Sequence, residues 1–114
     1  MKYTLHIRAF FDTTSLDDAA RFAKSTFPDF PVQIAGPYWK IDTLTEAVLH
    51  HDIVYANDTV AYDTTLSYFQ RISTDWTLRG PDNQSVVDGI VAAPCGAHMT
   101  WCHFELIRFD AEPS

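Results

Sequence analysis

Polar and apolar residues alternate at both ends of the chain, and this alternation is the strongest structural signal in the sequence. Residues 2–11 alternate as far as Ala9, which predicts a β-strand over 2–11 with one apolar and one polar face. Residues 99–109 repeat the pattern and predict a final strand, with Phe104 on one face and His103 on the other. We expect these two strands to be antiparallel neighbours.

Helical spacing of apolar residues marks two further segments. Over residues 15–27, Ser15 is placed as an N-cap, Asp18 follows in the capping-box position, and Pro28 ends the helix. Residues 59–73 also carry an apolar stripe at helical spacing and predict a second long helix.

The middle of the chain carries weaker and partly competing signals. Residues 32–41 predict a strand, with Pro37 at an edge or a bulge because proline cannot donate to a ladder. Residues 43–46 read Thr-Leu-Thr-Glu, a second capping box, which predicts a short helix through about His51. Residues 52–57 fit either a strand or a continuation of that helix, and the apolar run is too short to decide.

Near the C-terminus, residues 80–83 read Gly-Pro-Asp-Asn, a composition typical of turns. Residues 75–79 and 84–92 on either side predict the two strands of a hairpin, and residues 93–98 predict a loop. The last five residues, 110–114, are expected to fray.

Together these elements predict a single α+β domain over residues 1–114. Its mainly antiparallel sheet would carry the helices on one face. The preferred topology is a ferredoxin-like split βαβ arrangement with an added C-terminal hairpin.

Length and composition agree with one folded domain. The chain has 114 residues and 12.9 kDa, with 46% hydrophobic and 14% aromatic residues, so intrinsic disorder is not expected. No apolar run reaches the roughly 18 residues that span a bilayer. The N-terminal residues lack the apolar core of a signal peptide. We therefore expect a cytoplasmic protein that does not contact membranes.

Charge narrows the class of partner. The net charge is −7, from 15 acidic and 8 basic residues, which disfavours direct binding to nucleic acid. Residues 41–70 contain no Lys or Arg. One interpretation is a solvated face that maintains solubility. The other is an acidic docking surface for a basic protein.

The same stretch is rich in tyrosine, a residue type that often dominates the energy of protein interfaces. For a tyrosine on a helix, packing in the core with a solvated hydroxyl is the alternative. The predicted partner-binding residues are Asp42, Glu46, Asp52, Tyr55, Asp58, Tyr62 and Asp63.

This combination favours a small acidic protein-binding module without catalysis. The partner would be a basic protein, for example a nucleic-acid-processing enzyme, whose nucleic-acid-binding surface the module occludes. Toxin-immunity proteins and phage-encoded inhibitors of bacterial defence nucleases share this size and charge. A structural subunit of a larger assembly fits the composition equally well.

A different hypothesis uses the polar face of the predicted sheet. If the first and last strands pair, that face gathers histidine, arginine, tryptophan and glutamate side chains, which are able to perform acid–base chemistry near neutral pH. The alternative function is therefore a dimeric small-molecule-binding protein or enzyme; an ordinary solvated sheet face is the simpler explanation. The residues of this alternative pocket are His6, Arg8, Trp101, His103 and Glu105.

Cysteine and glycine patterns do not support other chemistry. Cys95, His98, Cys102 and His103 have no familiar zinc spacing, and strand alternation sends the last two to opposite faces. Cys95 lacks a nearby cation in sequence to lower its pKa. No phosphate-binding glycine motif occurs. The sequence therefore predicts no metal, no cofactor and no catalytic residue.

Overall fold

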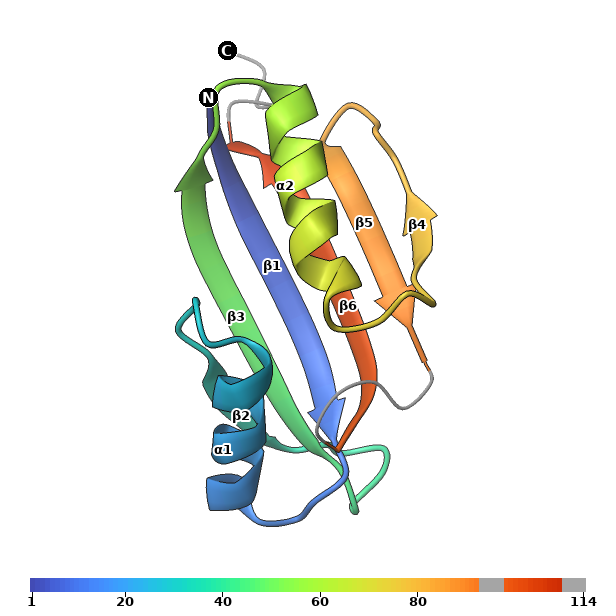
Figure 1. Cartoon of the computed structure of the whole chain (residues 1–114). Coiled ribbons are helices and arrows are strands. Elements are labelled where there is room, and N and C mark those ends of the chain that lie inside the picture. Colours follow the sequence, from blue (N-terminus) through green and yellow to red (C-terminus); the bar gives the residue numbers. More distant parts are fainter. Residues whose placement is uncertain (93–97, 110–114) are drawn as a thin grey trace.

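Strand β1 (Lys2–Phe11) forms the centre of a six-stranded sheet and pairs along its length with a strand on either side. The computed structural model describes residues 1–92 and 98–109 (Figure 1). The other elements are α1 (Leu16–Thr26), β2 (Gln33–Pro37), β3 (Thr45–Val54), α2 (Asp58–Gln70), β4 (Thr77–Arg79), β5 (Ser85–Val91) and β6 (Met99–Arg108).

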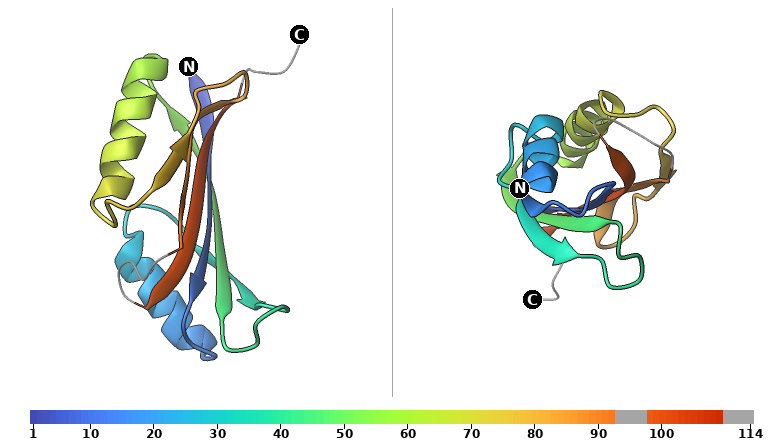
Figure 2. Two further views of the ribbon diagram at one scale, coloured as in Figure 1. Left: turned by 90° about the vertical axis from the view of Figure 1, so that its right-hand side faces the viewer. Right: turned by 90° about the horizontal axis from the view of Figure 1, so that it is seen from below.

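All pairings in the sheet are antiparallel, and the strand order is β2-β3-β1-β6-β5-β4. The first and last strands are antiparallel neighbours, as expected. Both helices lie on the same side of the sheet, and the other side is left uncovered (Figure 2). The protein is thus an α+β fold with its helices on one face of an antiparallel sheet.

The first strand and the first helix follow their local signals closely. The Ser15 side chain accepts a hydrogen bond from the Asp18 backbone N–H at 3.1 Å, which confirms the N-cap. At the other end, the Phe27 N–H donates to the Ala23 carbonyl at 2.8 Å, directly before Pro28. Helix α1 buries Ala19 and Ala23 against the sheet.

The short helix predicted from residues 43–46 through His51 is wrong, because this segment is the first part of β3. Its residues also alternate, with Thr45, Ala47 and Leu49 buried and the residues between them more exposed. Pairing with β1 along the whole strand and with β2 at residues 45–48 satisfies the backbone here. Thr45 does not cap a helix; its hydroxyl donates to the Thr13 carbonyl at 2.7 Å.

The remaining boundaries differ from expectation by a few residues. The undecided segment 52–57 is strand as far as Val54, and Asn57 then caps α2 by accepting from the Val60 N–H at 2.9 Å. The predicted helix 59–73 begins one residue earlier and ends at Gln70.

Two predicted strands are shorter in the structure. The strand predicted over 32–41 is reduced to β2, an edge strand whose register shifts between Ile34 and Gly36 and which ends at Pro37. The predicted hairpin 75–79/84–92 is present as β4 and β5. Most of the predicted loop, residues 93–97, and the tail 110–114 lie outside the described residues.

The hydrophobic core lies between the helices and the covered face of the sheet. Phe69 of α2 stacks on Phe104 of β6, with ring centroids 3.9 Å apart. Trp76 packs edge-on against both rings. Gly89 makes this packing possible, because a Cβ atom there would come within 2.4 Å of Phe104. These contacts fix α2 over the β6–β5 side of the sheet.

Within the described part of the chain, no helix combines the length and the apolar character that a membrane crossing requires.

Candidate functional site

The sheet separates the predicted partner-binding residues into two groups. Glu46 and Asp52 occupy alternate positions of β3 that face away from the helices, and Asp42 lies in the connection before this strand. Tyr55, Asp58, Tyr62 and Asp63 follow β3 and lie on the helix side. The acidic stretch therefore does not form one continuous surface.

The two carboxylates on the uncovered face already have partners. Glu46 forms an ion pair with Arg8, and Asp52 accepts a hydrogen bond from the Thr4 hydroxyl at 3.0 Å. Both contacts join β3 to β1 across the sheet, and such cross-strand pairs stabilise it. Both carboxylates therefore already take part in contacts within the sheet.

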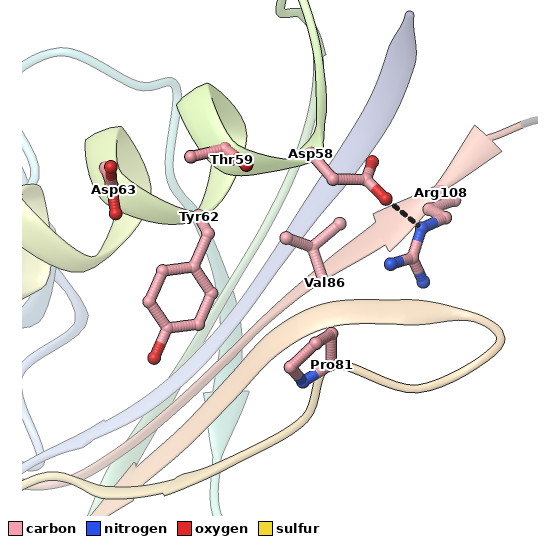
Figure 3. Close-up of a pocket in the computed structure, with 7 residues that line it drawn as sticks. All are labelled: Asp58, Thr59, Tyr62, Asp63, Pro81, Val86 and Arg108. Carbon is pink, nitrogen blue, oxygen red and sulfur yellow. Dashed lines mark hydrogen bonds and ion pairs between the residues drawn. The ribbon is translucent and has the colours of Figure 1, made fainter.

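The residues on the helix side surround a groove between the start of α2 and the β4–β5 hairpin (Figure 3). The groove has a volume of about 320 Å³. We call it the α2–β5 groove; its lining residues are Asp58, Thr59, Tyr62, Asp63, Pro81, Val86 and Arg108. Three of the seven predicted partner-binding residues are among them.

Asp58 is the centre of a polar network at one end of the groove. Its Oδ1 accepts a 2.7 Å hydrogen bond from the Tyr3 hydroxyl, and its Oδ2 accepts a 3.0 Å hydrogen bond from Arg108 Nε. Arg108 Nη1 donates to the carbonyl oxygens of Asp82 and of Ser85, the latter at 3.3 Å. The network thereby ties α2, β1, β6 and the hairpin together.

These contacts keep the network in a single protonation state near neutral pH. The hydrogen bond from Tyr3 and the contact with Arg108 lower the pKa of Asp58. Burial, together with the contact to Asp58, raises the pKa of Tyr3 to about 12, so its hydroxyl remains a donor. Backbone N–H groups of Ser85 and Gln84 lower the pKa of Asp82 beside the groove.

The polar and apolar parts of the groove are segregated. Val86, which is 1% exposed, lies between α2 and Pro81, and the ring of Tyr62 extends over the same region (Figure 3). Asp58, Thr59 and Asp63 lie along the helix at the rim. Asp63 is exposed and forms no ion pair with any residue that the structure describes.

The residues of the alternative pocket do come together on the uncovered face of the sheet. His6 lies opposite Glu105 in the β1–β6 register, and Arg8 lies opposite His103. Trp101 lies two residues before His103 on β6 and therefore faces the same side of the sheet. Its ring stacks on that of Phe10, with the ring centroids 5.0 Å apart. The five residues line a sheet surface, with the aromatic side chains at one end of it.

Cross-strand contacts constrain the ionisable groups on this face. His103 Nε2 lies 2.9 Å from Asp88 Oδ1, and Arg79 donates to the other oxygen of Asp88 at 2.9 Å. Glu105 accepts a hydrogen bond from Ser85. Burial and the neighbouring His50 lower the pKa of His6, against the opposing effect of Glu105. His103 and Glu105 are thus held by contacts to Asp88 and Ser85 of β5.

Sequence reasoning missed several residues of both regions. His50, whose ring centroid is 4.1 Å from that of His6, was not assigned to the uncovered face because its segment was predicted to be helical. Arg108, Val86 and Pro81 are far from Asp58 in sequence. No local pattern identifies them; the observed pairing of β5 with β6 and the turn at residues 80–83 place all three at one end of the sheet.

The described residues contain no group of three or more His, Cys, Asp or Glu side chains arranged to hold a metal ion. Cys102 is buried on the helix side of β6, whereas His103 faces the other side, as alternation predicts. Cys95 lies outside the described residues. His98 is described and stacks on Phe22 at 4.3 Å between ring centroids.

Comparison with protein-family models gave no match, and neither curated proteins nor solved structures gave a significant one. Functional inference therefore depends on the chain's own geometry and charge.

Proposed function

We propose that the protein is a non-catalytic acidic binding module that docks on a basic surface of a partner protein through the α2–β5 groove. One observation carries this proposal: Asp58, Tyr62 and Asp63, singled out for charge and aromatic character, line the same concave site. Concave sites with aromatic walls and a few polar groups are typical of recognition surfaces.

The charge of the molecule supports the same proposal. A net charge of −7 attracts a basic partner over long range and raises the association rate. At the groove, the charge of Asp58 is shared with Arg108, so the exposed Asp63 is the carboxylate with the most freedom to pair with a partner. The net charge of the whole molecule therefore contributes to the association rate, and the ion pair of Asp63 with the partner contributes separately to binding at the groove.

The partner class follows from what a compact acidic protein can block. Basic surfaces of nucleic-acid-processing enzymes bind phosphate backbones, and an acidic module that covers such a surface inhibits the enzyme by exclusion. We place this action in the cytoplasm, and the role is that of an inhibitor of the immunity or anti-defence type.

The test isolates the partner with the tagged protein and then measures association kinetics with the purified partner. We expect a rate that falls as salt is raised, because screening weakens long-range attraction. Asp63→Lys should slow association and speed dissociation. Asp12→Lys changes the net charge equally but lies just beyond the far end of β1, so it should affect only the steering contribution.

Two results would overturn the proposal. One is a partner that binds nucleic acid equally well with and without the module bound. The other is equal kinetics for Asp63→Lys and Asp12→Lys at every salt concentration, which would place the interface away from the groove.

A second candidate function uses the uncovered sheet face, because His6, Arg8, Trp101, His103 and Glu105 share it. A second copy of the chain covering this face would enclose a pocket for a small molecule. Sedimentation velocity at several concentrations distinguishes the candidates: this function requires a dimer that Trp101→Ala weakens, whereas the groove functions in a monomer.

The order of the connections supports a more specific fold assignment. β1 lies between β3 and β6, one helix follows β1, and the other follows β3. We propose that this is a ferredoxin-like split βαβ arrangement to which the β4–β5 hairpin is added before the last strand.

A further inference from the structure

The α2–β5 groove has the shape and charge of a site for one extended side chain. Its volume of about 320 Å³ is at the small end of ligand-binding sites. The exposed ring of Pro81 and the half-buried ring of Tyr62 supply the apolar surface of the groove, next to the buried side chain of Val86 (Figure 3). An occupant therefore needs an aliphatic portion to cover this surface.

The rim carries more negative than positive charge. Among the lining residues that the structure describes, Asp58 and Asp63 face one cation, Arg108, whose Nε and Nη1 atoms are occupied by Asp58 and by the carbonyl oxygens of Asp82 and Ser85. The carboxylate of Asp82 also lies nearby, where the charges of both Arg108 and Arg79 act on it. A cation at the rim gains from this excess, whereas an anion is repelled by it.

The walls of the groove are held in place before any ligand binds. Asp58 receives hydrogen bonds from Tyr3 on β1 and Arg108 on β6, and Tyr3 is 0% exposed. Arg108 in turn holds the carbonyl groups of the hairpin. A rigid wall costs little ordering entropy on binding, which favours a site for a flexible side chain.

We propose that the groove binds a cationic head group on an aliphatic chain, namely a single arginine or lysine side chain of the basic partner. The aliphatic portion packs on the rings of Pro81 and Tyr62, and the head group pairs with Asp63. This assignment rests on the proposed function and specifies how the groove recognises its partner. It identifies Asp63 as the residue that selects a cation.

The site can be tested without the partner by NMR titration of the whole protein with four small probes of similar length. Butylguanidinium and butylammonium carry the two cationic head groups, pentanol is neutral and pentanoate is an anion. We expect saturable shifts of the Thr59, Tyr62 and Val86 amide signals with both cations. Pentanol and pentanoate should bind more weakly at the same signals.

Two matched variants test whether the Asp63 carboxylate causes the preference for cations. Asp63→Asn should weaken both cations about two- to fivefold, the range of an exposed ion pair, and leave pentanol unchanged. Asp12→Asn makes the same charge change outside the groove and should leave the cations unchanged. The ratio of the two cation affinities shows whether the groove prefers arginine or lysine.

The proposal fails if pentanoate or pentanol binds as tightly as the cations, if no probe shifts these amide signals saturably, or if Asp63→Asn leaves cation affinity unchanged. These failures differ from failure of the proposed function. If the cationic probes bind the groove but Asp63→Lys leaves the kinetics with the partner unchanged, only the docking role is overturned. If Asp63→Lys changes the kinetics with the partner but no cationic probe binds the groove, only the side-chain site is overturned.

Discussion

The Tyr3 hydroxyl donates a 2.7 Å hydrogen bond to Asp58 Oδ1, which connects the second residue of β1 to the first residue of α2. The two residues are 55 positions apart in sequence. The side chain of Tyr3 is fully buried, so this hydrogen bond joins the core of the sheet to the rim of the groove.

Removal of the Tyr3 hydroxyl should destabilise the protein. In Tyr3→Phe the charged Asp58 loses one of its two donors, and a hydrogen bond to a charged group contributes about 1.5–3 kcal/mol. Urea unfolding at neutral pH measures this loss. Tyr62→Phe removes a hydroxyl that has no hydrogen bond within the described residues and should change stability by less than about 0.5 kcal/mol. Equal stability of the two variants would contradict the role of the hydrogen bond.

The lowered pKa of Asp58 makes part of the stability dependent on pH. The folded protein binds a proton at Asp58 less readily than the unfolded chain does, so this contribution is complete above the ordinary pKa of 3.8. It is lost as the pH falls through the lower pKa of the folded state. The unfolding free energy of wild type should therefore decline more steeply below about pH 4 than that of Asp58→Asn.

Unfolding curves collected from neutral to acidic pH test this prediction. Asp12→Asn provides the matched control for loss of one carboxylate at a position away from Tyr3 and Arg108. A slope for Asp58→Asn that matches wild type would show that the carboxylate is not stabilised by Tyr3 and Arg108.

Gly89→Ala should disturb the aromatic core under α2. The new methyl group would lie 2.4 Å from Phe104 Cε1, and Phe104 is stacked on Phe69, so the ring cannot move away freely. Overpacking of this kind costs about 1–3 kcal/mol. Thermal unfolding measures the cost, and combining the variant with Phe104→Leu should recover part of it. A double variant whose losses simply add would exclude this clash as the cause.

Thr45→Val tests why residues 45–51 form a strand. The Thr45 hydroxyl is buried and donates to the Thr13 carbonyl at 2.7 Å, and valine would leave that carbonyl without this donor. The expected loss is about 1–3 kcal/mol in urea unfolding. Thr43→Val makes the same change at an exposed loop position and should be nearly neutral. Comparable losses at both positions would contradict the prediction.

Local sequence predicted β1 and α1 correctly, because in both elements the local signals agree with the tertiary contacts that the element makes. In β1 the alternation matches a strand that is buried on one face, and in α1 the Ser15 cap, the apolar spacing and Pro28 define the same helix. At residues 45–51 two local signals conflicted. The capping box satisfies a few backbone groups, whereas pairing with β1 along the whole strand and with β2 at residues 45–48 satisfies the backbone here and buries Ala47 and Leu49.

The site was only partly predictable for the same reason. Charge and tyrosine content identified Asp58, Tyr62 and Asp63, but also Glu46 and Asp52, which the alternation of β3 places on the other side of the sheet. Composition does not report which face a side chain occupies. Arg108 and Val86 became part of the groove only through the pairing of β5 with β6 and the position of α2.

The sequence by itself determined the α+β class, the alternating faces of the two end strands and the excess of negative charge, because periodicity and composition are local properties of the chain. Only the tertiary structure decided that residues 45–51 are strand and that Asp58 meets Tyr3 and Arg108. Those outcomes depend on hydrogen bonds and burial between segments far apart in sequence, whose free energy exceeds that of the competing local cap.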